Sequence, residues 1–180
     1  AAFADQGTGS VGMTISNLQG GGSASLYAAA INHFDQVLIG GNSISPPQIP
    51  YAAYVDMNTN AAGPVIANLP STLVSTQILG VAMNRTGRSI VVGESNGSSY
   101  AAFVDPAGNT AGSPVANLPG SGSSLYAVAM NQSGLVLVGG FDPLTSIAYA
   151  AWIPPNTNAA SAPISSLPLN GGIFAVGIND

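Results

Sequence analysis

The sequence predicts an all-β protein built from four-stranded antiparallel sheets that follow one another along the chain. Sequence blocks recur at a regular spacing, short apolar runs alternate with clusters of Asn, Ser, Gly and Pro, and no long window has helical periodicity. The chain has 180 residues, of which 46% are hydrophobic and only 5% are charged. This composition suits sheets that are covered on both faces, because a sheet with one solvent face carries alternating polar residues.

The repeat has a period of 49 residues. A Tyr-Ala-Ala motif and a Leu-Pro pair each occur three times at this spacing. The motifs begin at Tyr51, Tyr100 and Tyr149 and at Leu69, Leu118 and Leu167. An apolar block that ends in Asn occurs four times, at residues 26–32, 78–84, 125–131 and 173–179. Three full copies and part of a fourth predict a tandem repeat architecture.

Each repeat contains four predicted strands, which we name A to D in chain order. In the first copy they cover residues 26–32, 36–40, 51–56 and 64–69. Asn, Ser and Gly cluster between strands A and B, and Asp, Asn and Thr cluster between strands C and D. Asn and Gly tolerate positive φ, so these clusters predict tight turns.

Strand A is apolar on both of its faces. Period-two alternation predicts two groups of side chains in the third copy. The groups are Tyr126, Val128 and Met130 on one face and Leu125, Ala127 and Ala129 on the other. Neighbouring sheets are therefore expected to cover both faces. Radial stacking of the sheets gives a β-propeller, and linear stacking gives a β-solenoid as the alternative.

The whole chain, residues 1–180, is predicted to form a single repeat domain. It comprises a half blade of strands C and D (1–20), blades at 21–70, 71–119 and 120–168, and the first strand of a further blade (169–180). The half blade is inferred because residues 1–18 align without a gap to residues 52–69. The chain then forms about four blades, or part of a larger propeller.

The two incomplete blades are candidate assembly edges, because unpaired strand edges attract partners. The terminal strands can close on each other, pair with a second copy, or join further blades of a larger protein. The apolar residues expected at these edges are Phe3, Ile15, Leu18, Phe174, Val176 and Ile178.

The charge distribution excludes several function classes. The formal net charge is −5, with two Lys or Arg residues and no Cys. Nucleic-acid binding is excluded because no basic face exists to neutralise phosphates. Disulfides and thiolate metal sites are excluded by the missing cysteines. No apolar run has the length that membrane insertion by a helix requires.

Few side chains offer candidate chemistry. His33 lies in a predicted A–B turn without a nucleophile motif, and no catalytic residue is assigned. Asp56, Asn58 and Asn60 alternate as oxygen ligands do at the start of a calcium loop, but the later glycine and glutamate are missing. These three residues are the candidate calcium ligands, with an Asx turn as the alternative. No cofactor is predicted.

Two other groups of side chains have a functional and a structural interpretation. Glu94 and Asp142 follow strand B in different copies and are either an acid–base pair or solvated loop charges. Five aromatic residues are either a sugar-stacking set or part of the core between blades. They are Tyr27, Tyr54, Phe103, Tyr126 and Trp152.

The third copy resembles a Kelch-type propeller blade. The resemblance rests on Gly139-Gly140 at the end of a strand, the aromatic strand from Tyr149 to Trp152, the turn at 155–158 and Leu167-Pro168. The tryptophan of the last Kelch strand is absent from every copy. The repeats also resemble tandem blades in the passenger regions of bacterial autotransporter proteins, which implies an extracellular or cell-surface location.

These observations predict a non-enzymatic extracellular or cell-surface protein with a structural or adhesive role, which self-assembles through its incomplete terminal blades. The expected partners are further copies or further blades of the same protein, and possible ligands are glycans or proteins. The alternative function is a lectin-like propeller with one shallow carbohydrate site in each blade. Glycan sites of that kind call for similar loops in every copy, but the loops after strand B differ in length and sequence.

Overall fold

The computed structural model describes residues 2–4, 11–18, 24–43, 49–70 and 76–180, and this part of the chain contains strands and no α-helix. The N-terminal pair is β1 (Ala2–Ala4) and β2 (Val11–Thr14). The first sheet is β3 (Ala24–Ile31), β4 (Val37–Ser43), β5 (Pro50–Asp56) and β6 (Ala61–Ala62). The second sheet is β7 (Thr76–Met83), β8 (Ser89–Ser95), β9 (Ser98–Asp105) and β10 (Thr110–Ala111). The third sheet is β11 (Ser124–Met130), β12 (Val136–Asp142) and β13 (Ile147–Ile153).

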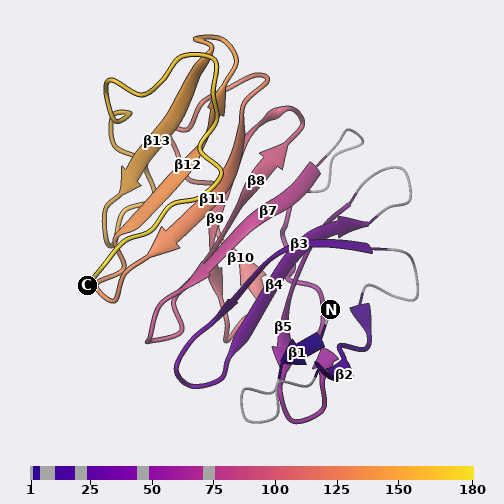
Figure 1. Ribbon diagram of the computed structural model, residues 1–180. Coiled ribbons are helices and arrows are strands. Elements are labelled where there is room, and N and C mark those ends of the chain that lie inside the picture. Colours follow the sequence, from indigo (N-terminus) through magenta and orange to yellow (C-terminus); the bar gives the residue numbers. More distant parts are fainter. Residues whose placement is uncertain (1, 5–10, 19–23, 44–48, 71–75) are drawn as a thin grey trace.

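Each sheet is an antiparallel meander, and its strands are neighbours in chain order. Figure 1 shows the sheets side by side, from the indigo N-terminal pair to the orange third sheet with the yellow C-terminal segment. Strand A of each copy (β3, β7 and β11) is an edge strand of its sheet. The all-β fold of stacked antiparallel blades is a β-propeller arrangement, as predicted.

The predicted fourth strand is shorter than expected. Its ladder is limited to the two residues of β6 and the two of β10, although residues 64–69 were predicted to form the strand. The chain then follows β5 through separate hydrogen bonds, from Gly63 N–H to the Tyr54 carbonyl and from Ile66 N–H to the Ala52 carbonyl (both 2.8 Å). Pro64 lies between the two donors and has no N–H of its own, so a regular ladder cannot continue there.

The same pair of hydrogen bonds recurs in the later copies. Ser161 N–H donates to the Trp152 carbonyl at 2.7 Å, and Ile164 N–H donates to the Ala150 carbonyl at 2.8 Å. Equivalent bonds in the second sheet join residues 112 and 103 and residues 115 and 101. The 49-residue spacing found in the sequence is therefore also the spacing of these backbone contacts.

A hydrogen-bonded latch joins each sheet to the next at the outer edge. Ala67 N–H donates to the Asn109 carbonyl at 2.9 Å, and Ala111 N–H donates to the Ala67 carbonyl at 2.8 Å. The Asn109 side-chain amide also donates to the Pro64 and Val65 carbonyls at 3.3 and 3.1 Å. The backbone bonds recur around Ser16 and Ala116, one copy earlier and one copy later. Polar backbone groups at the rim thus link the apolar faces of neighbouring sheets.

Three apolar cores lie between successive sheets rather than inside one sheet. On β4, Val37 and Ile39 face the core shared with the N-terminal pair, whereas Leu38 faces the core shared with the second sheet. On β8, Val91 and Val92 are divided in the same way between the cores on either side. This division confirms the prediction that both faces of the sheets are apolar and covered.

A β-bulge in strand A corrects the predicted alternation. The register shifts between Leu125 and Ala127, so that Leu125 lies in the same core as Val128 and Met130. Equivalent shifts occur in β3 and β7. A bulge adds one residue on one strand, and it therefore exchanges the faces of the residues on its two sides.

A glycine lies opposite each bulge. A Cβ atom at Gly93 would lie 1.9 Å from the Gln77 carbonyl oxygen, and Gly41 and Gly140 are equally close to strand A. Gly93 is therefore equivalent to the second glycine of the Gly-Gly pairs. In the second copy, Val92 takes the place of the first glycine of the pair.

Close approach of the sheets also needs a glycine at the next cross-strand pair. That pair is Ala28–Gly40 in the first sheet, Gly80–Val92 in the second and Ala127–Gly139 in the third. A Cβ atom at Gly40 would lie 2.6 Å from Ile78 Cγ2 of the next sheet. A Cβ atom at Gly80 would lie 2.9 Å from Val92 Cγ2 and 3.3 Å from Val128 Cγ1. The second copy thus has its glycine on strand A instead of strand B.

The C-terminal segment, residues 169–180, was predicted to begin a further blade, but it forms no strand ladder, and its one bridge pairs Leu169 with Ile147. Its side chains nevertheless lie on the third sheet as β7 lies on the first. A Cβ atom at Gly139 would meet Ile173 and Val176, just as one at Gly40 would meet Ile78 and Val81.

The glycines opposite the bulges make a direct test of this packing. Gly93→Ala places a methyl group against the backbone of β7, which cannot move without breaking the sheet. We expect the free energy of unfolding to fall by about 1–3 kcal/mol or more in urea titrations. Gly120→Ala is the matched control, because nothing lies within 4 Å of the added Cβ atom. Equal effects of the two substitutions would contradict the proposed steric constraint.

The buried tyrosines predict a loss of stability at alkaline pH. Burial raises the pKa of Tyr100 to about 12, and burial together with the nearby Asp142 carboxylate raises that of Tyr149 to about 12. Because the folded-state pKa exceeds the unfolded value near 10, stability is complete below about pH 10 and falls as the pH rises towards 12. Each tyrosine adds a slope of about 1.4 kcal/mol per pH unit in this window.

Replacing these tyrosines by phenylalanine should flatten the alkaline loss. Neither hydroxyl has a hydrogen-bond partner among the described residues, so Tyr100→Phe and Tyr149→Phe leave no group unpaired at pH 7. Urea titrations from pH 7 to pH 12 measure the effect. An alkaline slope that is unchanged in the double variant would show that other groups cause it.

Candidate functional site

The turns between strands A and B converge on one cavity of about 380 Å³, which we call the axial cavity. Each copy contributes the same kind of tripeptide, an apolar residue followed by Asn and a variable polar residue. The lining residues are Ile31-Asn32-His33, Met83-Asn84-Arg85, Met130-Asn131-Gln132, Ile178 and Asp180. The cavity is therefore formed jointly by all four copies of the repeat.

The asparagine of each tripeptide holds its turn in shape. The Asn84 carboxamide oxygen accepts hydrogen bonds from the backbone N–H groups of Thr86 (3.1 Å) and Arg88 (2.9 Å). Asn32 accepts equivalent bonds in the first copy, and Asn131 accepts the second of them from Leu135 in the third. This is the Asx-turn chemistry that asparagine supplies in short loops.

The residue after each asparagine is free to vary, because its side chain takes no part in the turn. In the first three copies this residue is His33, Arg85 or Gln132, and each of these side chains is exposed. Asp180 occupies the same position in the last copy, and its carboxylate oxygen accepts a hydrogen bond from Gln132 N–H at 2.7 Å. The cavity thus combines a repeated scaffold with four different polar groups.

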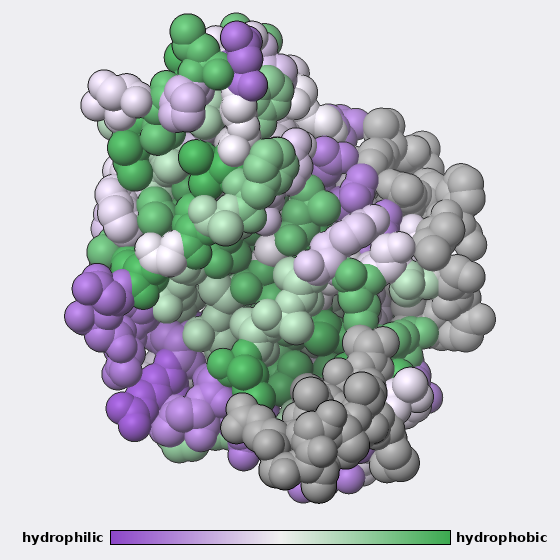
Figure 2. All heavy atoms as spheres, viewed as in Figure 1, coloured by the Kyte–Doolittle hydropathy of each residue, from purple (hydrophilic) through white to green (hydrophobic). Residues whose placement is uncertain are grey.

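Figure 2 shows hydrophilic residues gathered at the lower left, over the β3–β4, β7–β8 and β11–β12 turns and the C-terminal end. A hydrophobic area extends from there over the strands. Three exposed apolar side chains belong to β3 or to the C-terminal segment. They are Tyr27, Ile31 and Phe174, which are 50%, 56% and 73% exposed.

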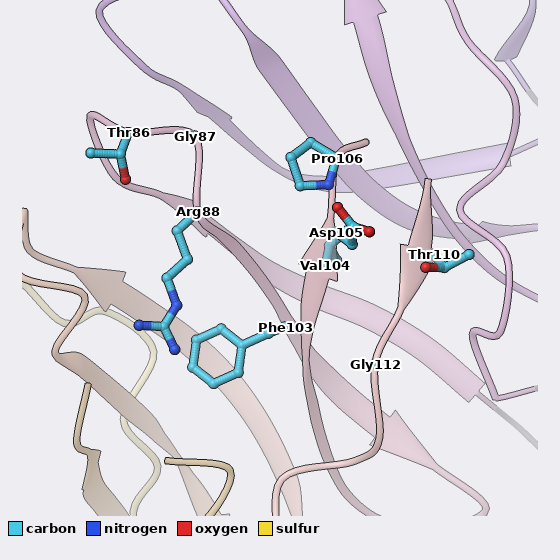
Figure 3. A pocket seen from close by; sticks show the side chains of 9 residues that line it. All are labelled: Thr86, Gly87, Arg88, Phe103, Val104, Asp105, Pro106, Thr110 and Gly112. Carbon is cyan, nitrogen blue, oxygen red and sulfur yellow. The ribbon is translucent and has the colours of Figure 1, made fainter. Parts of the chain in front are cut away.

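A second kind of site lies on the flank of the blades, between the A–B turn and the C–D turn. In the second sheet, this flank groove has a volume of about 500 Å³, and Figure 3 shows its lining residues. The Arg88 guanidinium lies over the Phe103 ring, with its carbon 4.2 Å from the ring centroid. Asp105, Pro106 and Thr110 lie on the other side of the groove.

The first sheet has an equivalent flank groove of about 670 Å³. Tyr54 replaces Phe103 there, Gln36 replaces Arg88, and Asp56 replaces Asp105. Tyr54 donates a hydrogen bond from its hydroxyl to Ser89 Oγ of the second sheet at 3.1 Å. The two grooves share a place in the fold and differ in charge.

Asp56 and Asn60, two of the candidate calcium ligands, have structural partners. Asp56 Oδ1 accepts a hydrogen bond from Asn58 N–H at 2.8 Å, which lowers the pKa of the exposed carboxyl group. The Asn60 carbonyl accepts Ser16 N–H at 2.8 Å in the outer latch. The Asx turn and the latch account for this Asp-x-Asn-x-Asn pattern. Among the described residues, no three His, Cys, Asp or Glu side chains form a group that could hold a metal ion.

The predicted assembly edges lie in three different environments. Phe3 lies in β1, and Ile15 and Leu18 pack in the core between the N-terminal pair and the first sheet. Val176 contacts the third sheet near Gly139, and Ile178 lines the axial cavity. Phe174 stacks on Tyr126, with their ring centroids 4.9 Å apart.

The other candidate side chains are dispersed. Ser124 donates a hydrogen bond to Glu94 at 2.7 Å, whereas Asp142 accepts bonds from Leu144 N–H and the Thr145 hydroxyl within its own turn. Tyr54 and Phe103 pack partly against the cores between sheets. The sequence analysis assigned His33 to a turn but did not predict that the four equivalent turns meet. The signal was the invariant Asn followed by a variable polar residue.

Stability measurements can test whether the asparagine of each tripeptide holds the turn while the residue after it does not. Asn84 is buried, and Asn84→Ala leaves two backbone N–H groups of the turn without their acceptor. We expect a loss of about 1–3 kcal/mol in the free energy of unfolding. Gln132→Ala, at the next position of the third copy, should change it by less than about 0.5 kcal/mol. Comparable losses for both variants would show that the variable residue is also part of the scaffold.

Comparisons with known proteins support the fold. No family model matches the chain, and no curated protein is similar to it in sequence. No helix among the described residues is long and apolar enough to span a membrane. The solved structure of hydrazine synthase from Kuenenia stuttgartiensis superposes with a TM-score of 0.66 at 11% identity, over 90% of this chain and 42% of that chain. The Dos1 propeller gives a TM-score of 0.48 at 14% identity, over 83% of this chain and 51% of that chain. This chain therefore spans less than half of the hydrazine synthase chain, and at this identity the similarity concerns the fold alone.

Proposed function

We propose that the chain is a non-enzymatic structural or adhesive propeller module of an extracellular or cell-surface protein. We further propose that it associates with a second molecule of the same protein through the open face of its first sheet. The observation that supports this proposal is the exposure of β3. Ile31 is 56% exposed and Tyr27 is 50% exposed, although both are large apolar residues.

The face that is exposed in β3 is covered in the other two A strands, β7 and β11. Val81, in the strand A of the second sheet, is 7% exposed because it packs against the first sheet near Gly40. Val128 in the third sheet packs near Gly80 in the same way. The equivalent residue of β3 is Ala29, which is exposed. An apolar surface of a second molecule would cover this face as the second sheet covers the first.

Charge does not oppose such an association. The strands of the first sheet carry one charged residue, Asp56, at the end of β5. An interface that joins one end of a chain to a different surface of the next is heterologous and generates a ring or a filament. The Kelch-like motifs and the resemblance to autotransporter passenger repeats support a secreted or surface location.

A lectin-like function is the second candidate, and the flank grooves are the observation in its favour. Tyr54 and Phe103 line equivalent grooves in two blades, as a site repeated in each blade requires. Arg88, however, lies over one face of the Phe103 ring and so competes with a sugar for stacking there. Assembly through β3 is therefore the primary proposal.

Self-association provides the test of the assembly proposal. We expect the wild-type chain to form oligomers in sedimentation-velocity experiments as its concentration rises. Ile31→Asp should shift the chain to the monomer, because a carboxylate cannot be buried unpaired in an apolar interface. Leu144→Asp is the matched control, since Leu144 is 75% exposed in the β12–β13 turn, away from this face.

Near-UV circular dichroism verifies that both variants remain folded. A wild-type chain that is monomeric at its highest soluble concentration would refute the assembly proposal. The same would follow if Ile31→Asp and Leu144→Asp changed the association equally.

A further inference from the structure

We propose that the axial cavity binds a small zwitterion, a molecule that carries a carboxylate and an ammonium group on an apolar body. Free apolar amino acids and short peptides share this chemistry. The inference goes beyond the assembly proposal, and the polar side chains that carry it do not belong to the open face of β3, although Ile31 contributes to both places.

The cavity is polarised along the order of the copies. Adjacent sheets are adjacent copies, so the variable residues occur around the cavity in the order His33, Arg85, Gln132 and Asp180. The two side chains able to carry positive charge belong to the first and second copies, and the carboxylate belongs to the last. Gln132, which is uncharged, separates them. A ligand with one charge of each sign matches both ends of this arrangement.

The axial cavity holds most of the basic side chains of this chain. The whole chain has one His and two Lys or Arg residues, and the axial cavity contains His33 and Arg85. The other basic residue, Arg88, stacks on Phe103 in the flank groove of the second sheet. His33, Arg85 and Asp180 are the charged or ionisable side chains that line the axial cavity.

Arg85 is the hydrogen-bond donor that the cavity offers to a carboxylate. The carboxamide oxygens of Asn32, Asn84 and Asn131 accept hydrogen bonds within the turns, and the Asn32 side-chain amide donates to Gln36 Oε1 at 2.7 Å. The Asn84 side-chain amide donates to the Gln132 carbonyl at 3.4 Å. Arg85 presents a planar set of N–H donors that pairs with a carboxylate through two hydrogen bonds.

The apolar members of the tripeptides provide a surface for the body of the ligand. Ile31, Met83, Met130 and Ile178 line the cavity beneath the polar ring. The volume of about 380 Å³ lies in the range of small-molecule sites. Methionine side chains adapt to ligands of different shape, which suits an apolar side chain of variable size.

Calorimetric titration with three related probes tests the proposal. Leucine carries both charged groups, N-acetylleucine lacks the ammonium group, and leucinamide lacks the carboxylate. We expect leucine to bind more tightly than either of the other two, by about tenfold or more, as the loss of a charge-assisted contact implies. The dipeptide Leu-Leu, tested in parallel, distinguishes a preference for peptides from one for free amino acids.

Two substitutions locate the contacts. Arg85→Gln should weaken the binding of leucine by about tenfold or more and remove the advantage of leucine over leucinamide. Asp180→Asn should remove the advantage of leucine over N-acetylleucine. Arg88→Gln is the matched control, because it removes the same charge outside the cavity and should leave all affinities unchanged.

Several results would overturn the inference. They are the absence of binding by leucine and Leu-Leu to the wild-type chain, equal affinities for leucine and leucinamide, or equal effects of Arg85→Gln and Arg88→Gln. Self-association of the wild-type chain is measured without any ligand, so failure here leaves the assembly proposal intact; ligand binding is tested only in chains that keep Ile31, because Ile31 also lines the cavity.

Discussion

The close approach of successive sheets is the constraint on which the rest of this structure depends. Each cross-strand pair at the junction contains a glycine, whether on strand B, as at Gly40 and Gly139, or on strand A, as at Gly80. The exchange in the second copy shows that the requirement applies to the pair and not to one strand. A methyl group on the glycine would collide with a branched side chain of the same or the neighbouring sheet. The repeated sequence is thus selected by the distance between sheets as well as by the sheets themselves.

This packing determines where polar residues can lie. Both faces of the internal sheets are apolar, so charged residues are confined to turns and strand ends. The turns between strands A and B then gather at one end of the array, because the A strands are the inner edges of neighbouring sheets. Several of the few polar and charged side chains in the turns therefore lie together around the axial cavity. The low charge content and the candidate site have the same physical origin.

Much of the fold was predictable from the sequence, because period-two alternation and turn residues act locally. The strands, their antiparallel pairing and the cover on both faces follow from such patterns. The bulge in strand A was not predictable in this way, and Leu125 was assigned to the wrong face for that reason. The short fourth strand depends on a proline between two bonded residues, which becomes evident only when the partner strand is known. The convergence of His33, Arg85, Gln132 and Asp180 depends on how sheets are arranged relative to one another, and local patterns carry no information about that.

The C-terminal segment shows which interactions are sufficient to hold a strand at a junction. Ile173 and Val176 occupy the places that Ile78 and Val81 occupy one junction earlier, yet the segment has no strand ladder. One backbone hydrogen bond, from Ile173 N–H to the Gly140 carbonyl at 3.0 Å, accompanies the side-chain packing. The segment therefore lies on the face of the third sheet through side-chain packing and this hydrogen bond. It follows that apolar packing against the face of the preceding sheet does not require a complete strand ladder.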